Sequence, residues 1–188
     1  GSAALNSLNG AGEVLLGDKT LQVAAGSYNG IIKGGNTSGL TKTGDGTFTL
    51  GGINAFTGTT LVESGTLLLA KEDTIANSSL VNLTGGSLKA SQNQIIKNLT
   101  TANGATVDVA KGGGTDYNLS ISGTADIGGT LENIGTFSTG TLTGSGLLQN
   151  IVTASIATAN LKADSELKNI TNLNVQAGAI NSQFSDVA

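Results

Sequence analysis

Apolar residues along this chain alternate with polar ones and do not recur at the helical spacing of 3.6 residues. Clear examples are residues 47–50, 107–109 and 119–121. Alternation of this kind, with Thr, Val and Ile lying between glycines, predicts short, half-buried strands. The one stretch that could suggest a helix, the alanine-rich segment 151–167, contains weak helix formers such as Thr153 and has no clear cap. We therefore expect an all-β protein.

A glycine followed by a short alternating run recurs along the chain, roughly every 19 residues. The glycines are Gly46, Gly65, Gly86, Gly104, Gly123 and Gly140. A unit of this length fits one coil of a parallel β-helix, with three short strands joined by turns and about 4.8 Å between coils. The 188 residues then predict roughly eight to nine coils. A β-sandwich shares the alternation but requires no fixed period, and it remains the alternative fold.

The register of the alternation also predicts which side chains point into the core. Each is the apolar partner in an alternating pair. These residues are Phe48, Leu50, Leu67, Leu88, Val107, Val109, Ile121, Ile127, Leu131 and Leu142.

The composition supports a folded solenoid. Gly, Thr, Asn and Ser together supply nearly half of the residues, and proline is absent. A proline inside a coil would remove a donor from the strand ladder, so its absence fits stacked coils. Leu, Ile, Val and Phe make up 26% of the chain, above the roughly 20% below which chains stay disordered.

Other absences limit the chemistry. The chain has no Cys or His, which removes thiolate metal sites, cysteine nucleophiles and the usual general base. It has no arginine and a net charge of −4, which argues against nucleic-acid binding. No apolar run is long enough to span a membrane, so we expect no membrane contact by this fragment. We predict no catalytic residue, no cofactor and no metal site.

Two motifs suggest chemistry at first sight. Asp108 and Asp126 lie one expected coil apart in similar settings, so adjacent coils would stack them at about one strand spacing, near the carboxylate separation of retaining glycosidases. Two exposed aspartates nevertheless lack the cleft that separates catalytic pKa values. The glycine run after Lys111 partly matches a calcium-binding turn, but such turns work in tandem and this one stands alone. We interpret both as ordinary surface.

Residues 26–69 carry a more specific signature. It reads Gly39-Leu-Thr-Lys-Thr-Gly-Asp-Gly-Thr-Phe-Thr-Leu, then Asn54-Ala-Phe-Thr-Gly-Thr-Thr, then Gly65-Thr-Leu. This segment resembles the autotransporter-associated β-strand repeat of passenger domains in Gram-negative type V secretion. Phe48, Ala55 and Phe56 replace the usual Leu, Thr and Tyr. The resemblance implies a right-handed parallel β-helix on, or released from, the bacterial surface. It also implies a C-terminal membrane barrel that is not among these residues, and a role for the repeat in export.

The expected organisation is therefore a single β-helix over residues 3–188, a fragment of a longer passenger, with Gly1-Ser2 as a cloning remnant. We expect an adhesin or host-surface-binding scaffold. A released effector or toxin that engages a host receptor is the alternative, and a polysaccharide-degrading β-helix enzyme is a more distant one.

Two segments that depart from the regular coil pattern, residues 71–73 and 111–117, carry charged or aromatic side chains of the kind that contribute most to binding. Tyr117, flanked by Lys111 and Asp116, is the predicted contact for a host-cell surface protein or glycan. We also expect self-association, because an uncapped solenoid exposes open sheet edges unless residues 3–25 or 165–188 cover them.

Overall fold

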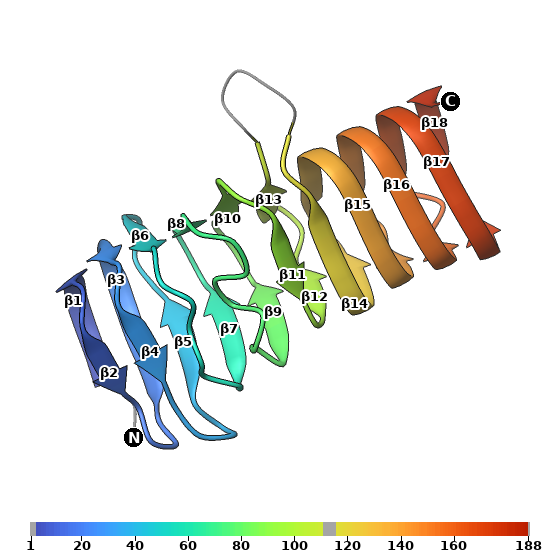
Figure 1. Cartoon of the computed structure of the whole chain (residues 1–188). Coiled ribbons are helices and arrows are strands. Elements are labelled where there is room, and N and C mark those ends of the chain that lie inside the picture. The colour runs from blue at the N-terminus through green and yellow to red at the C-terminus, as the bar shows by residue number, and fades with distance from the viewer. Residues whose placement is uncertain (1–2, 111–115, 188) are drawn as a thin grey trace.

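The computed structural model describes residues 3–110 and 116–187, and these residues form an all-β, parallel solenoid of about nine turns (Figure 1). No helix occurs in the described part of the chain, and so none could cross a membrane. The strands are β1 (Ala3–Gly10), β2 (Glu13–Leu15), β3 (Thr20–Tyr28), β4 (Ile31–Lys33), β5 (Gly39–Lys42), β6 (Thr47–Leu50), β7 (Thr59–Val62), β8 (Thr66–Leu69), β9 (Leu80–Leu83), β10 (Ser87–Ala90), β11 (Gln94–Ile96), β12 (Leu99–Thr101), β13 (Thr106–Asp108), β14 (Leu119–Ile127), β15 (Thr130–Gly144), β16 (Leu147–Leu161), β17 (Glu166–Ile180) and β18 (Gln183–Val187).

All pairings among the described strands are parallel and join equivalent strands of neighbouring coils. The sequence separation between partners changes from coil to coil: Leu142 pairs with Ala159, whereas Leu99 pairs with the more distant Ala125. The predicted β-helix is therefore confirmed, and the antiparallel sandwich is excluded as the fold. The segment that could have suggested a helix, 151–167, contributes most of β16 and the start of β17.

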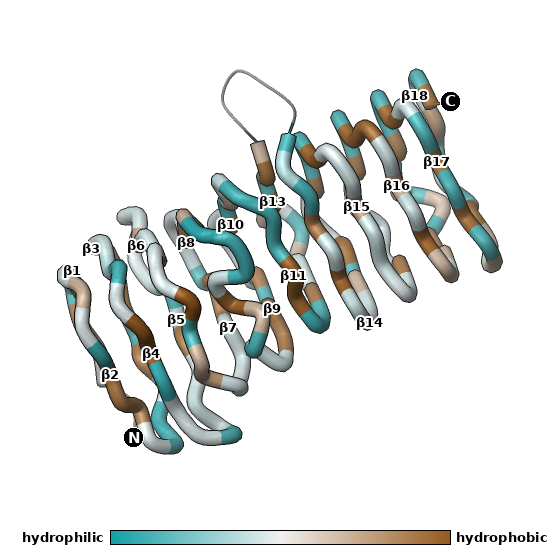
Figure 2. The backbone as a smooth tube through the Cα atoms, viewed as in Figure 1, coloured by the Kyte–Doolittle hydropathy of each residue, from teal (hydrophilic) through white to brown (hydrophobic). Residues whose placement is uncertain are grey.

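Apolar residues from successive coils form a single buried hydrophobic cluster inside the solenoid. Figure 2 shows short brown segments interrupted by white or teal ones along the coils, as alternation of apolar residues with Thr, Ser, Gly and charged residues requires. All ten side chains predicted to point inward are buried, including Phe48, Val107 and Leu131, which have no exposed surface. The register predicted from alternation is thus confirmed.

The coils change character along the axis. Near the N-terminus, short strands are separated by turns in which glycines such as Gly44 and Gly65 have positive φ. In β15, β16 and β17 a single strand of 15 residues follows most of a coil. Asn133, Asn150 and Asn169 bend these long strands through a left-handed conformation, with φ between 51° and 57°.

The first and last described segments are further coils and do not fold over the ends as caps. Within residues 3–25, β1 pairs only with β3; at the other end β18 pairs only with β17. Leu15 and Phe184 remain 73% and 51% exposed there.

Candidate functional site

Lys42 is a charged side chain buried at a corner of the solenoid. Its Nζ donates hydrogen bonds to the carbonyl oxygens of Thr43 (2.6 Å), Gly44 (2.7 Å) and Ser64 (3.1 Å). Three acceptors match the three donors of an ammonium group. Because Ser64 belongs to the next coil, the lysine joins two coils. Burial lowers the pKa of Lys42, and the nearby carboxylate of Asp45 partly offsets this effect.

Gly65 makes room for this lysine. It has a φ of 65°, and a Cβ placed there would lie 2.7 Å from Lys42 Nζ and still closer to backbone oxygens of the preceding coil. A side chain at position 65 would therefore both strain the backbone and displace the ammonium group.

A second polar element lies inside the same region. Asn54 is buried, and its Oδ1 accepts a hydrogen bond from Ile32 N (2.9 Å) while its Nδ2 donates to Gly52 O (3.0 Å) and Thr74 O (3.2 Å). The side-chain amide therefore continues the hydrogen-bond ladder where the strand itself is interrupted. Lys42 and Asn54 both stabilise stacking between coils, and neither is presented to a ligand.

The predicted contact Tyr117 lies at an open concavity of about 380 Å³ on the outer surface. We call it the Tyr117 concavity. Its lining residues are Asn93, Asp116, Tyr117, Asn118, Gly135, Thr136 and Val152. The structure thus places Tyr117 and Asp116 together beside a hollow. Lys111, the third residue predicted there, lies outside the described residues, as does most of the calcium-like glycine run.

Hydrogen bonds between successive coils fix the residues that line the Tyr117 concavity. Asn118 N donates to Asn93 Oδ1 (2.9 Å), and Asn118 Oδ1 accepts from Thr136 N (2.9 Å). Gly135 N donates to Tyr117 O (2.9 Å). A Cβ on Gly135 would collide with the backbone oxygen of Asp116, so only glycine allows this approach. The Tyr117 ring is half-buried and packs against the core, which orients it.

A second concavity, of about 280 Å³, lies further along the same strands. We call it the Ser155 concavity. It is lined by Ile121, Ser138, Thr139, Ser155, Ile156, Ala157, Asn174 and Gln176. Its polar groups are neutral hydroxyls and amides. The sequence singled out only Ile121 of these residues, as an inward one, because Ser, Thr and Asn occur throughout the chain.

The expected stacking of Asp108 on Asp126 is wrong. Asp108 lies in β13, where its ladder neighbours are Lys89 and Glu132, whereas Asp126 lies in β14 beside Thr100 and Thr143. The two aspartates share neither a strand ladder nor a face. The coil that follows Asp108 is longer than the regular unit, so the residue stacked on Asp108 is Glu132 and not Asp126.

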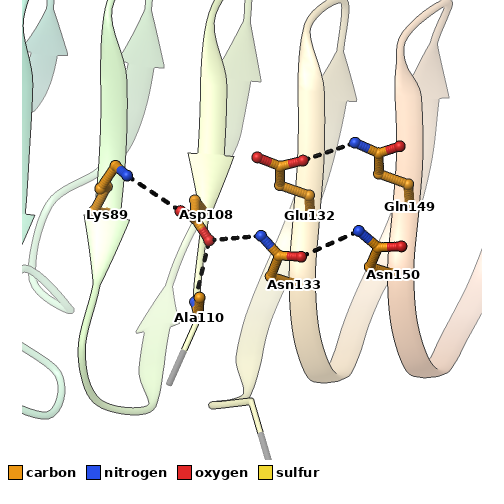
Figure 3. Close-up of polar contacts among 7 residues, drawn as sticks. All are labelled: Lys89, Asp108, Ala110, Glu132, Asn133, Gln149 and Asn150. Carbon is orange, nitrogen blue, oxygen red and sulfur yellow. Dashed lines mark hydrogen bonds and ion pairs between the residues drawn. The ribbon is translucent and has the colours of Figure 1, made fainter. Parts of the chain in front are cut away.

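Asp108 instead begins a row of polar contacts across four coils, and Figure 3 shows this row as far as Asn150. Its carboxylate forms an ion pair with Lys89 (3.3 Å) and accepts a hydrogen bond from Asn133 Nδ2 (3.0 Å). Asn150 then donates to Asn133 Oδ1 (3.2 Å), and Asn169 donates to Asn150 Oδ1 (3.0 Å). We call this row the asparagine ladder.

Glu132 lies next to the asparagine ladder and accepts a hydrogen bond from Gln149 Nε2 at 2.7 Å. The oxygens of Asp108 and Glu132 therefore serve contacts between coils. Among residues 3–110 and 116–187, no group of three or more Asp and Glu side chains is arranged to hold a metal ion.

The asparagine ladder escaped the sequence analysis, although a signal for it exists. The tetrapeptides Leu131-Glu-Asn-Ile, Leu148-Gln-Asn-Ile and Leu167-Lys-Asn-Ile recur once in each of three successive coils. Glycine is the usual residue at a tight corner, but asparagine also adopts positive φ, so a pattern of glycine corners alone misses this repeat.

The excursion at residues 71–73 is a structural turn. Asp73 has a φ of 53°, and its Oδ1 accepts a hydrogen bond from Ile95 N (2.8 Å). The carbonyl oxygen of Lys71 accepts from Thr74 Oγ1 (2.5 Å) and Gln94 Nε2 (2.7 Å). These contacts fix the turn to the next coil.

One known protein family matches the part of the chain that contains Lys42, Asn54 and Gly65, the residues that build the buried corner. Residues 40–69 match the passenger-associated-transport-repeat. This repeat belongs to autotransporter passenger domains, and a parallel β-solenoid around it fits such a passenger. The matched residues fall within the predicted range of 26–69. No curated protein and no solved structure matches the chain.

Proposed function

We propose that this chain is a rigid segment of an autotransporter passenger that binds a host-cell surface partner through the Tyr117 concavity, as an adhesin does. The passenger repeat and the solenoid support a place at the bacterial outer surface or in the released passenger. On this proposal the repeat at residues 40–69 stabilises the stack, and the C-terminal half carries the contact.

The observation that carries the proposal is the composition of the Tyr117 concavity. Binding energy concentrates in aromatic and apolar anchors that lie in recessed positions with polar groups around them. Tyr117 supplies the aromatic anchor, and Val152 adds an apolar side chain that is 47% exposed. Asp116 and Asn118 supply the polar surroundings. Other exposed apolar side chains of the described ranges, such as Ile53, Ile95 and Phe184, line neither of the two concavities.

The test compares binding of the wild-type chain and three variants to cultured host cells. We expect Tyr117→Ala to weaken binding about tenfold, the effect of a modest hot spot. Because the ring also packs against the core, a second variant, Val152→Arg, fills the hollow from an exposed position in β16. Asn160→Arg places the same side chain at an exposed position on another face of β16 and should bind as wild type does.

Thermal unfolding of all three variants is measured alongside binding, so that loss of fold is separated from loss of contact. If Tyr117→Ala and Val152→Arg bind as wild type does while remaining folded, the concavity is not the contact surface and the proposal fails.

A further inference from the structure

The Tyr117 concavity and the Ser155 concavity are connected through the same strands. Outward residues of β14, β15, β16 and β17 stack in register and form two columns along the solenoid axis. One column contains Thr136, Thr153 and Asn172, and the other contains Ser120, Ser138, Ser155 and Asn174. Coils repeat at about 4.8 Å, and residues two apart along a strand are separated by about 6.6 Å. The surface is therefore a regular two-column array with an aromatic ring at one end.

The chemistry of this surface selects among ligand classes. The lining of the Ser155 concavity is uncharged, and Asp116 is the only charged residue among the described residues that line the Tyr117 concavity. No lysine of the described ranges lines either concavity, and the chain contains no Arg or His. An anionic ligand such as a sialylated or sulfated glycan would find no cationic partner among these lining residues. A lipid would require a mostly apolar pocket.

The strand pairing also argues against an extended peptide. A peptide that adds a strand needs a free sheet edge, but β15 and β16 are each paired on both sides. Recognition at this surface must come from side-chain hydroxyls and amides. The side chains of Thr136, Ser155, Asn174 and Gln176 form no hydrogen bond to other residues in the described ranges, so they are available for a ligand.

We infer that the two concavities together bind a neutral glycan chain that runs along the solenoid axis, an inference that rests on the proposed function and names its partner class. One coil spacing is comparable to the length of one sugar residue in an extended chain. Successive sugars then meet a pair of hydroxyl side chains in β15 and in β16 and a pair of amide side chains in β17. The Tyr117 ring stacks against the apolar face of the first sugar. Binding by repeated weak contacts predicts affinity that increases with chain length over three to four sugars, one for each coil of the array.

The test presents the 188-residue chain with immobilised β1,4-linked glucose and N-acetylglucosamine oligomers of one to six residues, together with sialylated oligosaccharides. We expect neutral oligomers to bind, trimers and tetramers to bind at least about tenfold more tightly than monomers, and sialylated ones not to bind. Ser155→Leu, in the middle of the array, should reduce tetramer binding about tenfold without reducing the melting temperature. Asn160→Leu, the matched exposed position on another face of β16, should bind as wild type does.

A parallel measurement distinguishes the two proposals. Host cells are treated with glycosidases before binding of wild type and Tyr117→Ala is compared. If neutral oligomers do not bind and Tyr117-dependent cell binding survives glycan removal, the partner is a protein; the glycan inference falls while the proposed function stands. If Tyr117→Ala and wild type bind cells equally and neither binds oligomers, both fail.

Discussion

Single buried polar residues stabilise the contacts between coils in the N-terminal half. Lys42 and Asn54 use side-chain atoms to satisfy backbone groups that the interrupted strands leave without partners. Buried polar groups are costly unless they are hydrogen-bonded, and a fully satisfied arrangement fixes a single register. The passenger repeat therefore combines a polar corner clamp with an apolar core, which explains why a lysine occupies a buried position.

Replacement of Lys42 by methionine tests this clamp. The variant retains an apolar stem of similar length but leaves the carbonyl oxygens of Thr43, Gly44 and Ser64 without their donor. We expect the free energy of unfolding to fall by about 2–3 kcal/mol, because hydrogen bonds to a charged group contribute about 1.5–3 kcal/mol and these three acceptors are only partly buried. Urea unfolding measures the loss. Lys168→Met, at an exposed position, should change stability by less than about 0.5 kcal/mol. Equal stability of the two variants would show that the clamp contributes nothing.

Strands in the C-terminal half are aligned by the asparagine ladder. Asn133, Asn150 and Asn169 occupy equivalent corners of β15, β16 and β17, and each combines a positive φ with a side-chain hydrogen bond to the preceding coil. Asparagine suits this position because its short amide tolerates the left-handed conformation and reaches the next amide in the stack.

Two substitutions at Asn150 separate these roles. Asn150→Ala removes two ladder hydrogen bonds and places a Cβ at a φ of 54°, so we expect a loss of about 2–3 kcal/mol in the free energy of unfolding. Asn150→Gly also removes the hydrogen bonds but relieves the strain, and it should recover about 1 kcal/mol relative to alanine. Chemical denaturation of both variants gives the comparison. A glycine variant no more stable than the alanine variant would show that φ strain is unimportant here.

The whole molecule is a stack of similar coils in which each coil contacts only its neighbours. In the described residues β1 and β18 each pair with one strand, and Leu5, Leu15 and Phe184 are exposed near the two ends. Open backbone edges next to exposed apolar side chains are templates for further pairing.

We therefore expect the 188-residue chain to associate end to end, with an average mass that rises with concentration in sedimentation experiments. The double variant Leu5→Lys and Ser7→Lys places two charges along β1 and should shift the chain toward monomer, because like charges at an edge oppose pairing. Concentration-independent monomer behaviour of the wild-type chain would contradict this expectation.

The sequence alone determined the fold class, the approximate coil length and the inward register. Alternation of apolar and polar residues reports which side of a strand is buried, and this is a local property. The glycine motif follows one corner of the coil only as far as Gly104, because Thr106 pairs with Thr130, whereas Gly123 and Gly140 precede Thr124 and Thr141 at another corner. The short signature around Lys42 was also sufficient for the resemblance to passenger repeats.

Tertiary structure decided which outward residues meet. The sequence spacing between stacked partners varies from coil to coil, so a fixed period misplaced Asp126 relative to Asp108 and could not show Glu132 beside Asp108. The Tyr117 concavity likewise brings Asn93 and Val152 together from different coils. Which residues become neighbours on the surface depends on the summed lengths of the turns between them, and alternation does not constrain those lengths. Whether a residue points inward depends only on which side of its own strand it lies, so alternation is sufficient to predict it.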